Sequence, residues 1–302
     1  MGHEKTTTSR RRFVATTASA VAATIVPRHV LGGARFVPPS DRVNVAIIGV
    51  GGQGLHNARA LLQERDCQII AIADPAEEWD MSRSYHGGKA GRGPTRALIE
   101  ETYAERTPLY GCAVYEDFRV MLEEQPAIDA VLIATPDHHH AYESIWAMNA
   151  GKHVYCEKPL THSVEEARLV ARVARETGVA TQMGTQGRSG EGHRQTVEWI
   201  RDGAIGAVRE VHAWSGTGRP WRPRLPGEDA AVPPGFNWDL WIGPREPRPF
   251  RHEYTPGRWR GFWDFGCGTM PDMSVHHIDP AYNVRGLHTQ ETIEASATLV
   301  DP

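Results

Sequence analysis

The sequence predicts an α/β protein in which a parallel sheet, covered by helices on both faces, is followed by a second domain of different character. Over residues 43–185, short and almost continuously apolar segments alternate with helical patterns, as in parallel sheets buried on both faces. Beyond residue 186 the chain becomes rich in Trp, Pro and Gly. With 302 residues, it exceeds the size at which one hydrophobic core stops growing.

The composition indicates a soluble globular protein with an uneven distribution of charge. With 40% hydrophobic residues and 4 cysteines, it excludes the collagen-like, low-complexity, disulfide-scaffold and membrane-spanning classes. Residues 1–42 hold seven basic and two acidic residues, whereas residues 43–302 hold 26 and 35. The acidic main body argues against nucleic-acid binding, which requires Lys and Arg to neutralise phosphates.

Residues 1–42 are interpreted as a twin-arginine signal peptide and a linker. Ser9-Arg10-Arg11-Arg12-Phe13 precedes an uncharged, Ala/Thr-rich run that ends at Val26. This run is too short to span about 30 Å of hydrocarbon at about 1.5 Å per residue. A nuclear-localisation-type cluster and a basic amphipathic helix are the alternatives, both disfavoured because the run holds no acid or Lys. We expect recognition by the twin-arginine export machinery and a periplasmic or other extracytoplasmic location.

The four cysteines are interpreted as buried small hydrophobic residues. Twin-arginine substrates fold before export, so the thiols need not pair even though the destination is oxidising. Their positions offer no CxxC or zinc pattern. The residues are Cys67, Cys112, Cys156 and Cys267.

The start of the main body predicts a Rossmann dinucleotide-binding domain. An apolar strand from Val43 leads into Gly49-Val-Gly51-Gly52-Gln53-Gly54 and then into a helical pattern. Such glycines allow a tight turn and let backbone N–H groups approach a pyrophosphate at the helix N-terminus. The next strand, over residues 67–73, ends at Asp74, whose carboxylate can bind the adenosine ribose hydroxyls and would repel a 2′-phosphate. NAD is therefore favoured over NADP. The alternative to nucleotide binding is a glycine-rich turn with a purely structural role.

The pattern continues with strands expected at 128–134, 152–155 and 179–184 and helices at 141–150 and 164–176. Residues 84–108 interrupt it and are interpreted as a polar surface loop. Two strand ends carry polar residues, in Thr135-Pro136-Asp137-His138-His139-His140 and in Cys156-Glu157-Lys158-Pro159. Three consecutive histidines do not converge on one ion, so we expect no metal. Lys158 could pair with Glu157, but its place at a strand end beside a predicted nicotinamide favours a catalytic role.

GVGGQG, the strand ending in Asp74, ATPDHHH and CEKPL together resemble the Gfo/Idh/MocA family of sugar and polyol oxidoreductases, from about residue 43 to the end. The resemblance implies a Rossmann domain over 43–185 and an α+β domain with an open-faced sheet over 186–302. It also implies that Lys158 lies at the junction of substrate and nicotinamide. The cofactor-binding residues are assigned as Gly49, Gly51, Gly52, Gln53, Gly54, Asp74, Thr135, Pro136, His138, Glu157 and Lys158.

The segment Asp272-Met-Ser-Val-His276-His277-Ile-Asp279 resembles a second signature of this family. At helical spacing Asp272, His276 and Asp279 share one face, whereas His277 points about 100° away. We assign Lys158, Asp272 and His276 as catalytic. Neutral His276 is the candidate general base, Asp272 orients it or binds the substrate, and Lys158 stabilises a developing alkoxide.

The second domain bears on the substrate and on the completeness of the chain. Six of the nine Trp lie beyond residue 210, where they can stack on sugars or pack in the core. Arg188, Trp263 and Asp279 are assigned as substrate contacts, and strands are expected at 210–214 and 292–300. The family's second domain usually continues well beyond the catalytic helix, so we expect the sequence to be a fragment, or the domain to be reduced. A homo-oligomer would form through the sheet of this domain.

The predicted function is NAD-dependent hydride transfer from a hydroxyl of a sugar, polyol or glycoside. Because free NAD(H) is scarce outside the cytoplasm, an exported enzyme needs a tightly bound cofactor or a redox cycle that closes within one turnover. The second possibility defines the alternative function, a glycoside hydrolase or lyase that works through a transient keto-sugar. A silent nucleotide-binding module is disfavoured because all three catalytic candidates are present.

Overall fold

The computed structural model describes residues 41–82, 84, 86–104, 110–216, 228–255, 258–285, 292–294 and 296. The chain divides into two compact units, residues 1–42 and 43–302. The break falls directly before Val43, where the first strand begins. The predicted signal peptide and most of the linker lie outside the described residues, so export stays a prediction.

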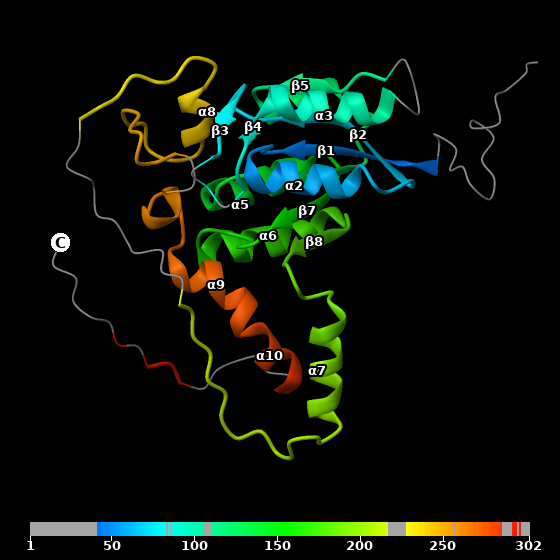
Figure 1. Ribbon diagram of the computed structural model, residues 1–302, viewed down its shortest axis with the longest axis vertical. Helices are drawn as coiled ribbons and strands as arrows, with labels where there is room; N and C mark the ends of the chain where they lie inside the picture. Colours follow the sequence, from blue (N-terminus) through cyan, green and yellow to red (C-terminus); the bar gives the residue numbers. More distant parts are fainter. Residues whose placement is uncertain are drawn as a thin grey trace, which may run out of the picture. The chain divides into compact units, whose positions relative to one another are not determined.

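A six-stranded parallel sheet forms the centre of the fold. The strand order is β5-β2-β1-β6-β7-β8, so the chain starts in the middle and builds the two halves in turn (Figure 1). The order reverses between β1 and β6, and open parallel sheets bind ligands beyond the carboxyl ends of the strands at this switch point. The strands are β1 (Val43–Ile48), β2 (Cys67–Ala73), β5 (Ala113–Tyr115), β6 (Ala130–Ile133), β7 (His153–Glu157) and β8 (Thr181–Gly184).

Helices cover both faces of this sheet, as predicted. α2 (Gly52–Leu61) and α3 (Arg92–Ala104) pack on one face in a buried cluster with Ile47. α4 (Phe118–Glu124), α5 (Asp137–Asn149) and α6 (Val164–Thr177) cover the other face in a cluster with Ile48. Neighbouring residues of β1 thus face opposite clusters, because side chains alternate along a strand. The α/β prediction is confirmed for this part of the chain.

The prediction of a surface loop over residues 84–108 is wrong. β3 (Trp79–Asp80) and β4 (Lys89–Ala90) pair as an antiparallel hairpin, and α3 follows it. Ile99 and Tyr103, four residues apart on α3, are buried against the sheet. The polar residues of α3 obscure this apolar helical spacing in the sequence: Arg96 and Glu101 are exposed, whereas Arg92 and Thr95 are themselves buried.

The described part of residues 186–302 consists of helices and loops and holds no strand of either sheet. The strand predicted at 210–214 is wrong, since that segment has no regular structure and Val211 and Trp214 are exposed. A strand needs a neighbour for its backbone groups, and none of the described segments pairs with it. The strand predicted at 292–300 lies mostly outside the described residues. The helices are α7 (Glu191–Arg201), α8 (Trp238–Ile242), η2 (Trp259–Gly261), α9 (Thr269–His277) and α10 (Asp279–Arg285).

An aromatic cluster gathers around α8 and supplies a core for the C-terminal part. Trp238 and Trp241 are buried, with ring centroids 4.9 Å apart. Core packing therefore accounts for Trp238, whereas Trp241 is buried and also lines the cavity described below. Trp214 and Trp263 are exposed, and Trp221 lies outside the described residues. The remaining members of the cluster are Ala76, Phe236, Ile242, Phe250, Tyr254, Phe262 and Phe265.

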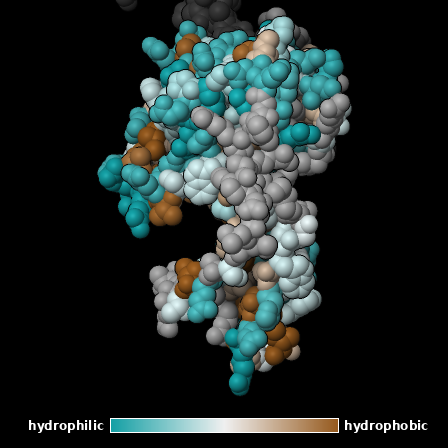
Figure 2. All heavy atoms as spheres, turned by 90° about the vertical axis from the view of Figure 1, so that its left-hand side faces the viewer, coloured by the Kyte–Doolittle hydropathy of each residue, from teal (hydrophilic) through white to brown (hydrophobic). Residues whose placement is uncertain are grey.

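On the face drawn in Figure 2, hydrophilic residues predominate and hydrophobic ones occur in small groups. Within the described ranges, no helix combines the length and the apolar character needed to cross a membrane. All four cysteines are free thiols, and Cys112 and Cys156 are buried. Burial raises the pKa of Cys112 to about 12, so this thiol behaves as the small hydrophobic residue that was expected.

Candidate active site

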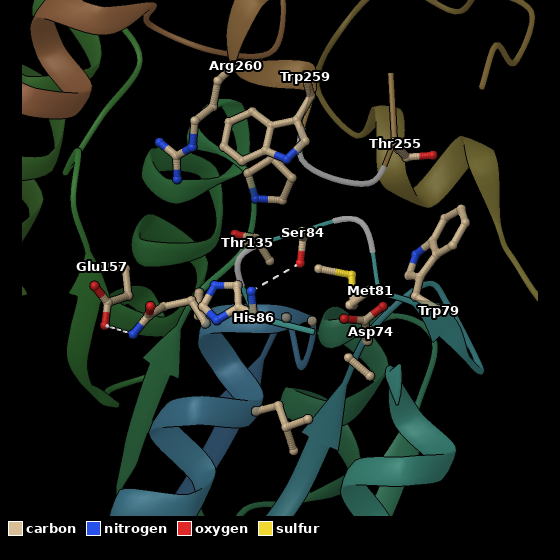
Figure 3. A pocket seen from close by; sticks show the side chains of 18 of the residues that line it. Asp74, Trp79, Met81, Ser84, His86, Thr135, Glu157, Thr255, Trp259 and Arg260 are labelled. Atoms are coloured by element: carbon tan, nitrogen blue, oxygen red, sulfur yellow. Dashed lines mark hydrogen bonds between the residues drawn. The ribbon is translucent and has the colours of Figure 1, made fainter. Parts of the chain in front are cut away.

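The loops after β1, β6 and β7 meet at the carboxyl edge of the sheet. Together with the β3–β4 hairpin, η2 and α9 they line a cavity of about 1430 Å³ (Figure 3). The cavity therefore joins the predicted cofactor loop to the predicted catalytic helix. The assigned residues that line it are Gly49, Gly51, Gly52, Gln53, Asp74, Thr135, Pro136, Glu157, Lys158, Asp272 and His276.

The glycine loop has the geometry that a dinucleotide diphosphate requires. Gly49 has a φ of +80°, and a Cβ on Gly54 would lie 1.8 Å from the carbonyl oxygen of Gly49. These two glycines allow α2 to begin close against β1. Gly51, the N-cap of α2, has open space where a Cβ would lie and forms no side-chain cap. The first N–H groups of α2 are therefore suited to phosphate oxygens, and the residues fit NAD.

Asp74 is held in place at the end of β2. Its two carboxylate oxygens accept hydrogen bonds from the backbone N–H of Val50 and of Ala76, both at 2.8 Å. Burial raises the pKa of Asp74 to about 6, although these bonds and the charge of Arg92 lower it. Each oxygen keeps a further lone pair, so the carboxylate can still accept from a ribose hydroxyl. Arg92 also donates to the carbonyl oxygen of Asp74 at 2.7 Å.

Lys158 is paired with Asp272, and not with its neighbour Glu157. The Lys158 Nζ donates to Asp272 Oδ1 at 2.5 Å, and Nη1 of Arg260 donates to the same oxygen at 2.7 Å. Arg260 Nη1 also lies 3.2 Å from Oδ1 of Asp137. The side chains of Asp272 and Asp137 are 2% and 0% exposed. Two cations and two buried carboxylates thus form one charge-balanced network at the wall of the cavity.

His276 lies one helical turn beyond Asp272 on α9 and lines the same cavity. Burial, followed by the charge of Lys158, lowers the pKa of His276 below 6.5. A hydrogen bond with the backbone of Gln186 and the charge of Asp272 act in the opposite direction. The imidazole is therefore neutral at pH 7 and has the proton-accepting form that a general base needs.

Thr135 and Glu157 line the cavity and are each held by a hydrogen bond to another side chain. The Thr135 hydroxyl donates to Oε2 of Glu143 at 2.6 Å, and Glu143 is buried on α5. Burial raises the pKa of Glu143 well above its ordinary value. Glu157 accepts from Nδ2 of Asn57 at 2.7 Å, which links the end of β7 to α2. Both side chains face the cavity with their orientation set by a second residue.

His138 does not line the cavity. It is 1% exposed, and its ring nitrogens lie 3.2 Å from the carbonyl oxygen of Phe265 and 3.0 Å from that of Trp241. His139 also contacts the Trp241 carbonyl, at 2.7 Å. α5 begins at Asp137, four residues before the predicted start, so the histidines form its first turn. His138 and His139 join the Rossmann domain to the aromatic cluster around α8, whereas His140 contacts the carbonyl oxygens of Thr135 and Pro159.

The signature predicts that Asp272, His276 and Asp279 share one face of a single helix. In the structure Asp279 instead belongs to a separate helix. α9 ends at His277, and a separate helix, α10, starts at Asp279. Pro280 has no N–H to continue the hydrogen-bond pattern of α9, which explains the break. Asp279 pairs with Arg188, so these two proposed substrate residues contact each other away from the cavity lining. Trp263, the third, is 68% exposed and also lies outside that lining.

Three residues of the site had no signal in the sequence. Arg260 reaches Asp137 across 123 positions of chain, and Asn57 reaches Glu157 across 100. His86 lies in the segment that was interpreted as a surface loop, yet it lines the cavity (Figure 3). Contacts this distant in sequence depend on how the elements pack, and no local pattern encodes them.

A doubly wound parallel sheet with a glycine loop at its switch point defines a dinucleotide-binding fold, and a Lys–Asp–His group lies beside that loop. Residues 94–185 match the sequence model of an oxidoreductase family described as an NAD-binding Rossmann fold. Residues 194–298 match the model of its C-terminal alpha/beta domain. The chain belongs to this family, Gfo/Idh/MocA, and the predicted order of a Rossmann domain followed by a second domain, which matches the family's C-terminal alpha/beta domain, is confirmed.

Known members of the family include sugar and polyol enzymes. The chain is 40% identical over 152 residues to a 1,5-anhydro-D-fructose reductase from Ensifer adhaerens, covering 48% of this chain and 44% of that one. It is 30% identical over 166 residues to a scyllo-inositol 2-dehydrogenase (NAD(+)) from Bacillus subtilis, covering 55% and 42%. A solved myo-inositol 2-dehydrogenase from Lactobacillus plantarum is 26% identical, with a TM-score of 0.42, covering 55% and 43%. The matched segments span less than half of each relative.

Proposed function

We propose that this protein is an NAD-dependent oxidoreductase that acts on a hydroxyl group of a sugar, polyol or glycoside. The observation that supports it is the cavity itself, which the glycine loop, the Lys158–Asp272 ion pair and His276 line together. The names of the relatives, a sugar reductase and a polyol dehydrogenase, support the same substrate class.

The proposed mechanism assigns a separate task to each side chain. NAD, when bound, supplies the acceptor for the hydride that leaves the carbinol carbon. Neutral His276 accepts the hydroxyl proton, and its hydrogen bond with the Gln186 backbone orients the ring. The Lys158 ammonium group stabilises the negative charge that develops on the substrate oxygen. Asp272 holds Lys158 in position and shares its carboxylate with Arg260, whose charge Asp137 also compensates.

One experiment tests this function directly. The purified full chain is incubated with a panel of free sugars, polyols and glycosides, and the released small molecules and the cofactor are identified by mass spectrometry. A keto product with an equivalent amount of reduced nicotinamide supports the proposal. Release of an aglycone, or elimination without net reduction, would instead identify the redox-neutral hydrolase or lyase. Absence of both kinds of product from folded protein would overturn enzymatic activity on this class.

The pH dependence tests the role of His276. Because burial and then the charge of Lys158 lower its pKa, the imidazole takes up a proton at a lower pH than an unperturbed histidine does. We expect kcat/KM to fall as the pH decreases through a value below 6.5, since protonated His276 cannot accept the hydroxyl proton. In His276→Gln the rate should drop by about 10²- to 10⁴-fold and lose this acid limb. A variant that keeps both the limb and the rate would assign the base to another residue.

The proposed cellular setting is extracytoplasmic, with a tightly bound cofactor and a homo-oligomer formed through the second domain. The extracytoplasmic location is supported by the Arg10-Arg11-Arg12 sequence, which precedes an uncharged apolar run. Cell fractionation of the wild type and of a variant in which Lys replaces Arg10 and Arg11 tests export. Retention of both proteins in the cytoplasm would contradict it.

A further inference from the structure

A histidine from the β3–β4 hairpin lies directly against the glycine loop. Within the hairpin, the Met81 backbone N–H donates to the Gly88 carbonyl oxygen at 2.7 Å, and His86 lies in the connection between the strands. A Cβ on Gly52 would lie 2.1 Å from Cδ2 of His86 and 2.8 Å from its Nε2. The imidazole therefore lies against the first residue of α2, and Figure 3 shows His86 among the residues that line the cavity.

Packing and backbone hydrogen bonds fix this hairpin to the dinucleotide fold. Met81 and Ala90 of the hairpin segment are buried with Leu55 of α2 in one apolar cluster. Directly after β4, the Gly91 N–H donates to the carbonyl oxygen of Val50 in the glycine loop at 3.0 Å. Two independent attachments to the loop and to α2 therefore determine where His86 lies.

The surroundings of His86 are positively charged and suited to an anion. The N–H groups at the start of α2 give that helix end a partial positive charge. His56 on α2 and Arg260 on η2 are the charged or titratable groups that act on His86, and after burial they lower its pKa. The other ionisable residues that line the cavity are Arg59, Asp74, Asp80, His139, His140, Glu157, Lys158, His252, Glu253, Arg258, Asp272 and His276.

We propose that His86 is a ligand of the cofactor diphosphate, donating a hydrogen bond from its imidazole to a phosphate oxygen, and that it takes up a proton from solvent when the dinucleotide binds. A diphosphate would add negative charge beside an imidazole whose pKa is lowered by burial and, after it, by His56 and Arg260, so binding favours the imidazolium form. The inference rests on the proposed NAD-dependent function. It extends the phosphate site from the backbone of α2 to a side chain of the hairpin.

Calorimetric titration of the purified full chain with ADP-ribose tests this proposal without relying on turnover. At neutral pH, titrations in two buffers with different ionisation enthalpies measure the protons taken up on binding. The wild type should take up protons, and His86→Gln should lose most of this uptake. His86→Leu, which removes the donor altogether, should bind about tenfold more weakly. His252→Gln, which changes another histidine of the same cavity, should leave both quantities near the wild-type values.

The outcomes separate this inference from the proposed function. If the wild type binds ADP-ribose but both His86 variants keep its affinity and proton uptake, the role of His86 is overturned and the NAD-dependent function stands. Tighter binding by His86→Leu would likewise overturn it, because the side chain would then obstruct the site. If folded wild type binds neither ADP-ribose nor NAD, both proposals fail together. Thermal unfolding of each variant verifies that the hairpin substitutions leave the fold intact.

Discussion

Lys158→Met is expected to slow hydride transfer by about 10²- to 10³-fold, the effect of removing one donor that stabilises a developing oxyanion. The methionine fills a similar volume but cannot donate to the substrate oxygen. The fold should survive, because Asp272 keeps its hydrogen bond from Arg260 at 2.7 Å. Single-turnover measurement of reduced nicotinamide, with a substrate identified from the panel, gives the rate.

Lys158→Arg is the matched control for this prediction. It preserves the positive charge while changing the position of the donors, so its rate should lie between those of the wild type and Lys158→Met. A Lys158→Met enzyme with wild-type kcat would remove Lys158 from the reacting centre and leave it only its structural pairing with Asp272.

Asp272→Ala is expected to lower the free energy of unfolding by about 3–5 kcal/mol, as for other buried ion pairs that lose one partner. The substitution leaves Lys158 and Arg260 facing each other without the carboxylate that both contact at 2.5 and 2.7 Å. Asp137 lies 3.2 Å from Arg260 and compensates only that cation. Chemical denaturation followed by fluorescence measures the loss.

The isosteric Asp272→Asn variant separates charge from packing. Its amide oxygen can still accept one hydrogen bond, but it carries no negative charge, so we expect a smaller loss of stability than in Asp272→Ala. Substitution of the exposed Asp202 by Asn provides a surface control and should change stability little. If Asp272→Ala lost less than about 1 kcal/mol, the network would have the small energy of an exposed pair.

The Rossmann half of the fold was predictable because its signals are local. β1 is a largely apolar run that Gly49 follows directly. Gly49 has a positive φ, which glycine adopts freely. The second domain was less predictable, because the expected strand at 210–214 would need a neighbouring strand that the described residues do not supply. α3 was missed because its buried positions, such as Ile99, are few among many polar residues.

The candidate site divides in the same way. Motif spacing indicated Lys158, Asp272 and His276, and the structure places all three on one cavity. Motif spacing could not indicate that Arg260 shares the carboxylate of Asp272, because that contact joins η2 to α9 through their packing. Nor could it indicate that the signature helix breaks before Asp279 and turns that residue toward Arg188.

By itself, the sequence determined the class of fold, the cofactor loop and the residue types needed for hydride transfer, because turns, strand periodicity and helical spacing act over a few residues. Only the tertiary structure decided which charges pair, which histidines are structural, and that His86 lies over the first turn of α2. The physical reason is that burial and electrostatic pairing depend on three-dimensional distance. Residues 114 positions apart, such as Lys158 and Asp272, become partners only when the sheet edge and α9 meet.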